Sequence, residues 1–232
     1  MVDQFFPEVG VATVKVLRHL GVDVASPEDQ TCCGQIGFNA GYRKEAADVA
    51  RHFVDTFESY DYVVAPSGSC ASMIKNYYPE LFGDDPEMLE RAKAVGEKTY
   101  EFSDFIVNVL GVTEVGGTAT GLVTYHDACH LLRELGISEE PRSLIAGVRG
   151  VEMQEMAKSD ACCGFGGLFS AKFPEISTAM LDEKLQNVAD TGASSVVAND
   201  CGCLMQMRGA LRRSGSAVHP KHIAELLAEG LD

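Results

Sequence analysis

The sequence predicts an α/β protein made of two pseudo-symmetric, Rossmann-like halves with largely parallel sheets, each half carrying a CysCysGly (CCG) motif. Three observations support this prediction. Short β-branched runs alternate with stretches whose apolar residues recur at helical spacing. The CCG motif occurs twice, in "QTCCGQIGF" at 30–38 and in "DACCGFGGL" at 160–168. The 232 residues suffice for two halves of about 100–120 residues, which we place at 1–115 and 116–232.

The elements of the first half follow from hydrophobic periodicity. Residues 8–20 and 43–58 carry apolar side chains at helical spacing and predict two amphipathic helices. The β-branched run in "YDYVVAPSGSC" predicts a buried strand that feeds a loop ending at Cys70. Residues 87–111 are predicted to be largely helical. The Gly- and Thr-rich segment 111–121 is the predicted linker between the halves.

The second half continues the alternation of strands and helices. It is predicted to begin with the strand "GLVTYHDAC", followed by a helix around 139–147, a strand near "GVEMQEM" and the CCG loop. A helix at 174–191, with Met180, Leu181, Leu185 and Val188 facing inward, leads to the strand "SSVVAND", and "HPKHIAELLAEG" closes the chain as a helix. Strands separated by helices imply parallel βαβ units, whose ligands bind at the carboxyl ends of the strands. The cysteines fall at those ends.

Composition narrows the class of partner. The formal net charge is −15 and the acidic residues are spread along the chain, which argues against nucleic acid or an anionic membrane as a primary partner. No run of about 20 apolar residues predicts a membrane span, and the N-terminus lacks the pattern of a secretory signal. We therefore expect a cytoplasmic protein.

Cysteine usage points to metal or redox chemistry. The eight cysteines are Cys32, Cys33, Cys70, Cys129, Cys162, Cys163, Cys201 and Cys203. A chain of this length has no need of a disulfide scaffold, and clustered thiols in a reducing cytosol more often bind a metal or act in redox chemistry.

Aligning the halves on the CCG motif shows a gap in the first half. Cys70 then matches Cys203, and the second half has one further thiol, Cys129, which lies 33 residues before Cys162. Its counterpart would lie just before Met1, so the first half lacks one strand and one cysteine. We expect that the natural protein, or its ancestor, begins about ten residues upstream, the length of one strand with its cysteine.

The array Cys…CysCysGly…Cys favours an iron–sulfur cluster. Four thiolates from distant segments commonly hold such a cluster, whereas a single Zn²⁺ favours Cys-x2–4-Cys knuckles. The glycine after the cysteine pair removes side-chain bulk and lets backbone N–H groups approach sulfur. Zinc, or a vicinal disulfide of the adjacent thiols, is the alternative.

The chain resembles a known family in six segments that cover nearly its whole length in order. These are "FFPEVGVATVKVLRHLGV", "QTCCGQIGFNAGYR", "YVVAPSGSC", "YHDACHLLRELGI", "ACCGFGGLFSAKFPEISTAMLDEK" and "GCLMQMRGAL". The pattern is similar to the cysteine-rich CCG domain of iron–sulfur oxidoreductases, which occurs twice in one component of heterodisulfide reductase and in the glycolate oxidase iron–sulfur subunit. The resemblance to the lactate utilization protein A family is closer still. Members of that family usually begin with a strand ending in a cysteine just before the segment matching Val2-Asp3-Gln4.

The resemblance implies a ligand set for each half. Cys129, Cys162, Cys163 and Cys203 would bind one [4Fe–4S] cluster in the second half. Cys32, Cys33 and Cys70 would be the remainder of a first-half set, which binds a second cluster only if the upstream cysteine exists. Heterodisulfide reductase relatives end the array in CxxC, whereas this chain has Ser67 and Asp200 in place of the first of those cysteines. Ordinary four-thiolate ligation is therefore expected, and Cys201, which fits neither pattern, is expected to fill space in a loop.

Polar neighbours of the cysteines have two interpretations each. His126 and His130 flank Cys129 and either donate N–H bonds to cluster sulfurs or lie at the strand end as polar surface residues. Asp127 is expected to cap the next helix rather than act as an acid, and Arg133 either offsets cluster charge or is solvated. Ser67 and Ser69 are candidate hydrogen-bond donors to the sulfur of Cys70.

The resemblance implies an iron–sulfur electron-transfer subunit of a complex that oxidises L-lactate to pyruvate. Its partners would be a ferredoxin-like iron–sulfur subunit and a third subunit. Two alternatives stay open: a heterodisulfide reductase-like thiol–disulfide oxidoreductase subunit, and a zinc-stabilised structural subunit. Neither the substrate nor the subunit that contacts it follows from these residues.

Overall fold

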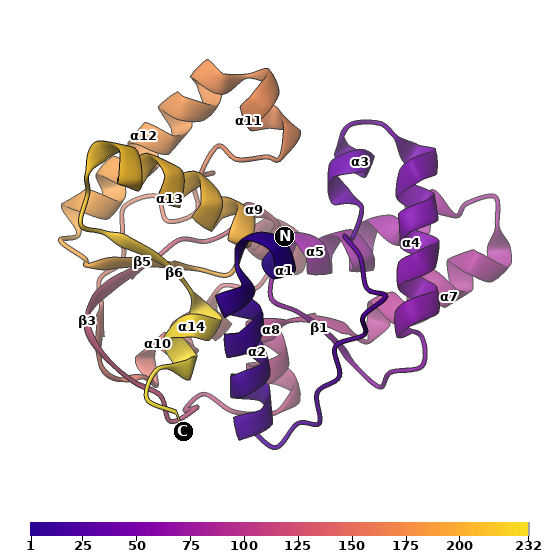
Figure 1. Ribbon diagram of the computed structural model, residues 1–232, viewed down its shortest axis with the longest axis horizontal. Coiled ribbons are helices and arrows are strands. Elements are labelled where there is room, and N and C mark those ends of the chain that lie inside the picture. Colours follow the sequence, from indigo (N-terminus) through magenta and orange to yellow (C-terminus); the bar gives the residue numbers. More distant parts are fainter. Residues whose placement is uncertain (232) are drawn as a thin grey trace.

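Two parallel sheets organise the computed structural model, which describes residues 1–231 (Figure 1). The larger sheet has the order β4-β3-β5-β6, formed by Arg149–Met153, Thr118–Tyr125, Ser195–Ala198 and His219–His222. The smaller sheet pairs β1 (Val63–Ala65) with β2 (Thr99–Glu101). Every pairing is parallel, so the predicted α/β class with largely parallel sheets is confirmed.

The larger sheet changes direction at its centre. From β3 the chain crosses to β4 on one side through α9 (Cys129–Leu135) and α10 (Glu139–Ala146). It returns through α11 (Leu168–Lys172) and α12 (Pro174–Asp190) to β5 on the other side of β3, and α13 (Cys201–Ser214) leads on to β6 and α14 (Ile223–Ala228). The connections after β3 and β5 therefore diverge. A crevice for a ligand forms at the carboxyl ends of two strands whose connections diverge in this way.

The burial pattern explains why these segments fold as they do. All four residues of β5 are buried, as expected of a strand covered by helices on both faces. On α12 the buried residues Ser177, Leu181, Lys184 and Val188 recur at helical spacing. The predicted inward positions Leu181 and Val188 are confirmed, but a lysine shares their face.

The first half has the following elements before β1: α1 (Val2–Phe5), α2 (Pro7–His19), α3 (Gln35–Asn39) and α4 (Arg43–Phe57). After β1 come α5 (Gly68–Ser72), η1 (Met73–Tyr77), α6 (Tyr78–Leu81) and α7 (Pro86–Glu97); α8 (Phe102–Asp104) and η2 (Phe105–Val109) follow β2. The helices predicted at 8–20 and 43–58 are confirmed. Within residues 1–231 the first half has no strand that corresponds to β3 of the second half. Residues 22–26, the first of which align with β4, do not pair with any strand.

Two predicted helical segments are wrong in part. The segment 87–111 is interrupted by β2, which forms because Thr99–Glu101 pairs with β1, and local periodicity does not report such a pairing. Residues 219–222 form the edge strand β6 beside β5 rather than a helix. Pro220 is compatible with that edge because its missing N–H faces no further strand. The predicted linker 111–121 is irregular only as far as residue 117, since β3 begins at Thr118.

The two halves are packed together by buried contacts. Helix α2 lies beside α14, and its residues Val16 and Leu17 share one apolar core with Tyr125 and Ile223 of the second half (Figure 1). Helix α5 packs on α9, at the ends of β1 and β3. No helix within residues 1–231 is long and apolar enough to cross a membrane.

The closest approach at the α5–α9 contact depends on Gly68. A Cβ atom at this position would lie 2.6 Å from Cβ of Leu131 on α9. Replacing Gly68 with alanine is therefore expected to push the two helices apart and lower the free energy of unfolding by about 1–3 kcal/mol. Urea denaturation measures the change.

Gly83→Ala is the matched control, because a Cβ there meets no atom within 4 Å. It should unfold like the unsubstituted chain. Equal midpoints for Gly68→Ala and Gly83→Ala would contradict the tight contact between α5 and α9.

Candidate metal centre

Four thiols of the second half converge near the carboxyl ends of β3 and β5. Cys129 begins α9, Cys162 and Cys163 lie in the loop after β4, and Cys203 lies in the first turn of α13. Each thiol shifts the pKa of its neighbours, Cys162 with Cys129 and Cys163, and Cys163 with Cys203, so the four side chains lie close together. The structure thus brings together the four predicted second-half residues, which come from three separate loops.

The glycine of each CCG motif fixes the shape of its turn. Gly164 has φ +81°, and a Cβ there would lie 2.5 Å from the carbonyl oxygen of Ser177 on α12. Its N–H donates to Sγ of Cys162 at 3.4 Å. Gly34 has φ +82° and donates in the same way to Sγ of Cys32 at 3.5 Å. Glycine is therefore required for conformation and close approach, and it turns a backbone donor toward sulfur.

The imidazole ring of His126 has no hydrogen-bond partner within residues 1–231 although it is fully buried. Its exposed fraction is 0%, and neither ring nitrogen makes a hydrogen bond within residues 1–231. Leaving a buried polar group unsatisfied costs about 1–3 kcal/mol. The ring lies against Cys163 and Cys203, and one donor atom from each of the three residues falls within 4.8 Å of the others. The unsatisfied imidazole and the crowded thiols form a group of donors that could hold a metal ion.

Mutual hydrogen bonding gives the four thiols unequal acidity. Bonds from Cys129 and Cys163 lower the pKa of Cys162 to about 2, and the bond from Cys163 lowers the pKa of Cys203 to about 7. Donating those bonds raises the pKa of Cys129 and Cys163 well above the ordinary thiol range. Because metal ligation needs every thiol deprotonated, a cation in this site would release protons on binding.

The first-half thiols form a smaller group. Sγ of Cys33 lies 3.5 Å from Sγ of Cys70, and Cys32 is next to them and exposed. The hydrogen bond from Cys33 lowers the pKa of Cys32 to about 5. The Tyr78 hydroxyl supports the turn by donating to the Cys33 carbonyl at 3.0 Å. These are the three predicted first-half residues. Cys201 is 2% exposed, and burial raises the pKa of its thiol.

Asp200 joins the two cysteine groups. Its carboxylate caps α13 by accepting from N–H of Gly202 at 2.9 Å. The other oxygen accepts from the Ser67 hydroxyl at 2.9 Å and from the Ser69 N–H at 3.1 Å, on the loop that leads to Cys70. The pKa of Cys70 is lowered chiefly by its hydrogen bond with Cys33, and the Ser67 side chain lowers it further. The sequence did not predict that Asp200 forms hydrogen bonds between the two halves, although an aspartate just before "CGC" is typical of a helix N-cap.

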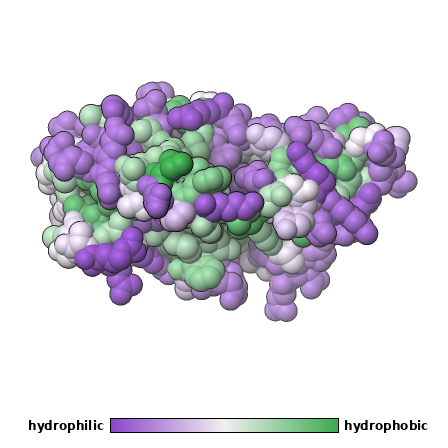
Figure 2. Space-filling view, turned by 90° about the horizontal axis from the view of Figure 1, so that it is seen from above, coloured by the Kyte–Doolittle hydropathy of each residue, from purple (hydrophilic) through white to green (hydrophobic). Residues whose placement is uncertain are grey.

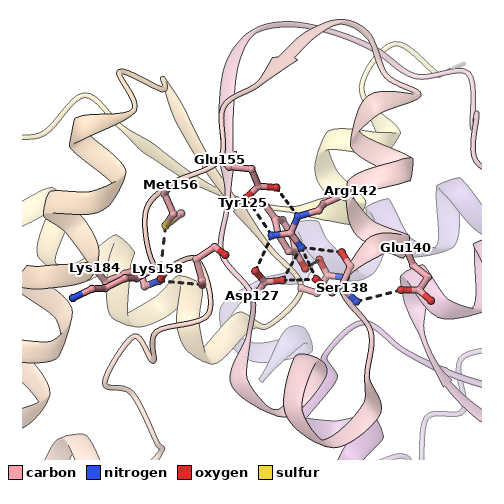
Figure 3. A network of polar contacts seen from close by, with 11 residues as sticks. Tyr125, Asp127, Ser138, Glu140, Arg142, Glu155, Met156, Lys158 and Lys184 are labelled. Carbon is pink, nitrogen blue, oxygen red and sulfur yellow. Dashed lines mark hydrogen bonds and ion pairs between the residues drawn. The ribbon is translucent and has the colours of Figure 1, made fainter.

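A buried ion pair supports the loop between β3 and α9 (Figure 3). The Arg142 guanidinium donates to both carboxylate oxygens of Asp127 at 2.8 Å, and its Nε donates to Glu155 at 2.5 Å. Burial is the largest single influence on Asp127 and raises its pKa. The pairing with Arg142 and the other hydrogen bonds outweigh burial, so the pKa of Asp127 is lowered overall. The prediction that Asp127 caps the next helix is wrong, because the N-cap of α9 is Ala128. No sequence signal identified Arg142.

The other flanking residues also bind protein groups. His130 Nδ1 lies 3.5 Å from Sγ of Cys129, and its Nε2 lies 3.9 Å from Glu134. Arg133 donates to the Asp160 carbonyl at 3.0 Å, just before the second CCG motif. Lys184 lies on the buried face of α12. The sequence did not identify it as a functional residue, although its helical spacing from Leu181 and Val188 places it on their buried face.

A further buried network lies beneath the crevice. Glu101, at the end of β2, accepts from Asn199 Nδ2 at 3.0 Å and from the Ser103 N–H at 2.8 Å. Asn199 follows β5 directly and accepts from the Tyr125 hydroxyl at 3.1 Å. The carboxyl ends of β2, β3 and β5 are therefore tied together below the cysteines. Burial raises the pKa of Glu101 to about 8.

Comparison with known proteins identifies relatives of the whole chain. The family model "CCG: Cysteine-rich domain" matches residues 1–75 and 123–208, one match for each cysteine group. Lactate utilization protein A of Bacillus cereus (strain G9842) is 46% identical over 227 residues, covering 98% of this chain and 95% of that protein. Lactate utilization protein A 2 of Bacillus mycoides (strain KBAB4) has the same identity and coverage.

Among solved structures, a glutamate racemase from Francisella tularensis subsp. tularensis SCHU S4 in complex with D-glutamate aligns over 95% of this chain and 74% of that chain. The TM-score is 0.36 and the identity 13%, a likeness too weak to carry an inference.

The Glu101 network predicts a pH dependence of stability. Between its ordinary pKa of 4.5 and about 8, the folded chain keeps a proton on Glu101 that the unfolded chain has lost. Stability therefore falls as pH rises through this window, by at most about 1.4 kcal/mol per pH unit from this group. Glu101→Gln removes the titration.

We expect the free energy of unfolding of Glu101→Gln, relative to that of the unsubstituted chain, to increase steadily from pH 5 to pH 8. Any constant effect of the amide on hydrogen bonding cancels from this slope. Chemical denaturation of the reduced apoprotein at several pH values provides the measurement. Parallel curves for the two proteins would show that Glu101 is ionised in the folded state throughout.

Proposed function

This chain belongs to the CCG cysteine-rich domain family, in the family of lactate utilization protein A, and on that premise we propose that it takes part in lactate utilization as an iron–sulfur subunit. Its role would be to carry electrons within a complex that oxidises L-lactate to pyruvate. The family relationship supports the involvement in lactate utilization. The electron-transfer role is supported by the chemistry of the cysteine groups.

One observation carries the proposal: four thiols and an unsatisfied imidazole meet at the crevice of a parallel sheet. Cys129, Cys162, Cys163 and Cys203 would hold a [4Fe–4S] cluster, and the free ring of His126 is placed to donate an N–H bond to its sulfur. When bound, such a cluster exchanges single electrons. The donor set fits this group, since thiolates are its usual ligands and backbone N–H groups already point at sulfur.

The surrounding residues would control access to the cluster. Cys163 and Cys203 are buried and Cys129 and Cys162 are half-buried, so the thiol group reaches the protein surface at Cys129 and Cys162. Burial shields the ligands from water and oxidants. The half-buried side would be where a partner exchanges electrons. We propose that the partners are a ferredoxin-like iron–sulfur subunit and a third subunit of the same complex.

The first-half group would bind a cluster less completely. Three thiols, Cys32, Cys33 and Cys70, meet there within residues 1–231. A four-iron cluster on these ligands would need a fourth donor from outside this set. We therefore expect the first-half site of this chain to be loaded substoichiometrically or not at all.

A zinc-stabilised structural subunit is the second candidate function. It is favoured by the donor atoms of His126, Cys163 and Cys203, which lie within 4.8 Å of one another. Three or four donors at such close range suit a single tetrahedral ion. Metal analysis separates this candidate from the first.

Anaerobic reconstitution of the full chain with iron and sulfide tests the proposal. About four irons and four sulfides per chain are expected in the second half, since a [4Fe–4S] cluster fills one site of four thiolates. Cys163→Ala should lose most of this iron and the accompanying EPR signal after reduction. Cys201→Ala is the matched control: it also removes a buried thiol, but one outside both hydrogen-bonded groups, and it should keep full loading.

Stoichiometric zinc with no iron in protein purified without oxygen would refute the cluster and favour the structural candidate. Equal iron loss in Cys163→Ala and Cys201→Ala would contradict the proposed ligand set. Involvement in lactate utilization is checked separately, because growth on L-lactate should be lost in a strain that carries only the Cys163→Ala protein.

A further inference from the structure

We propose that Lys184 is a positioning residue of the second-half site, holding the turn before the CCG motif and placing a buried positive charge behind Cys163 and Cys203 that the first-half site lacks. The effect on a cluster rests on the proposed function. The placement of the charge and its effect on metal binding do not.

The ammonium group of Lys184 is bound to main-chain oxygens. The residue is 1% exposed, and its Nζ donates to the carbonyls of Lys158 at 2.6 Å and Ser159 at 3.0 Å, with Met156 Sδ at 3.8 Å (Figure 3). Lys158 has φ +52°, the one positive value at a residue other than glycine within residues 1–231. A backbone in this region is strained by roughly 1–3 kcal/mol and persists only when its surroundings hold it. Lys184 supplies that hold from the neighbouring helix.

The same turn is fixed from its other side. The Ser159 carbonyl also accepts from the N–H of Asp127, which follows β3, and the Asp160 carbonyl accepts from Arg133 on α9. Lys184 therefore ties α12 to a turn that also contacts the segment bearing Cys129 and leads to the CCG cysteines. Two residues beyond Asp160 the chain reaches Cys162.

A neutral donor could hold the turn without burying a charge. Burying an ammonium group costs several kcal/mol unless an opposite charge compensates. Lys184 takes part in no ion pair among the described residues, and burial lowers the pKa of its ammonium group. The negative groups that oppose this effect are led by Cys163, followed by Asp160, Asp127 and Cys203. The Lys184 ammonium group therefore lies within electrostatic range of Cys163 and Cys203, whose thiols become negatively charged when they ligate a metal.

The internal repeat provides a comparison within the molecule. Glycines 34 and 164 approach equivalent points on the following helices, the carbonyl oxygens of Ala46 on α4 and Ser177 on α12. In this register Phe53 of α4 occupies the place of Lys184. The first-half turn is held instead by the uncharged hydroxyl of Tyr78. Within residues 1–231 the first half therefore has no counterpart of Lys184. The N-terminal ammonium group acts on the first thiol group instead, where it helps to lower the pKa of Cys32, so the two groups differ in their electrostatic surroundings.

The consequence for function is a difference in reduction potential. Net charge near a cluster and hydrogen bonds to it set its potential, and a nearby cation favours the more negative, reduced state. A cluster in the second half should therefore accept electrons more readily than one held by the same ligands without Lys184.

Three variants separate charge from hydrogen bonding. Lys184→Gln keeps a donor for the turn but loses the charge, and Lys184→Met loses both. Lys158→Met is the matched control, because Lys158 belongs to the same turn but its side chain is 65% exposed and pairs with Glu183. All are made in the full chain with Cys32, Cys33 and Cys70 replaced by serine, so that the second-half thiols alone bind metal.

Cd²⁺ titration of the apoprotein, followed by thiolate charge-transfer absorbance, is the first measurement. Both Lys184 variants should bind Cd²⁺ on the order of tenfold more weakly than Lys158→Met. After reconstitution with iron, spectroelectrochemical titration should give a lower reduction potential for both Lys184 variants. The potential of Lys158→Met should equal that of the protein with both lysines intact. A failure to take up iron would count against the proposed function while the Cd²⁺ comparison still tests Lys184.

The proposal is overturned if Lys184→Gln matches Lys158→Met in Cd²⁺ affinity and in potential, since a residue that only supports the turn would give that result. Loss of folded structure in Lys184→Gln, seen by circular dichroism, would likewise assign the lysine a structural role alone.

Discussion

The parallel pairing of β3 with β5 is the constraint on which the rest of the molecule depends. Val123 pairs with Ser195 and Tyr125 with Val197, and the ladder continues as the His126 N–H donates to the Val197 carbonyl at 2.9 Å. Because the connections after the two strands diverge, both chain segments leave the sheet at one crevice. This brings Cys129 and Cys203 together, and the loop after β4 adds the CCG cysteines. The thiol group is therefore a product of topology, with glycine geometry refining its shape.

The sequence predicted those elements of the fold that are determined by local hydrophobic periodicity, and it missed those that depend on contacts between distant residues. The helices near 8–20, 43–58 and 174–191 and the strands before the cysteines were predicted because their hydrophobic periods are strong. β2 and β6 were missed because each is a short run, of three or four residues, whose strand state depends on a neighbour distant in the chain. Lys184, Arg142 and Asp200 act through tertiary contacts. Of these three, Arg142 left no trace in the pattern, whereas Lys184 interrupted the apolar face of its helix.

The duplicated CCG motif gives two groups of thiols, Cys129, Cys162, Cys163 and Cys203 in the second half and Cys32, Cys33 and Cys70 in the first. Both halves share the left-handed glycine and its N–H donated to sulfur, so the turn itself is repeated. The strand that would match β3 is absent from the first half of residues 1–231, and with it a fourth thiol. Apolar side chains are exposed in the segments that follow both motifs, among them Ile36 after the first and Phe173 and Ile176 after the second. Figure 2, which looks down on the side of α3, α11 and α12, shows apolar residues grouped between polar ones.

The central claim is that the second-half thiols alone hold a four-iron cluster. Mössbauer spectroscopy tests it most directly, on the full chain with Cys32, Cys33 and Cys70 replaced by serine and reconstituted with ⁵⁷Fe. The account predicts the delocalised valence signature of an intact [4Fe–4S] cluster that accounts for nearly all the iron. A spectrum of isolated high-spin iron, or a protein that retains none, would contradict it.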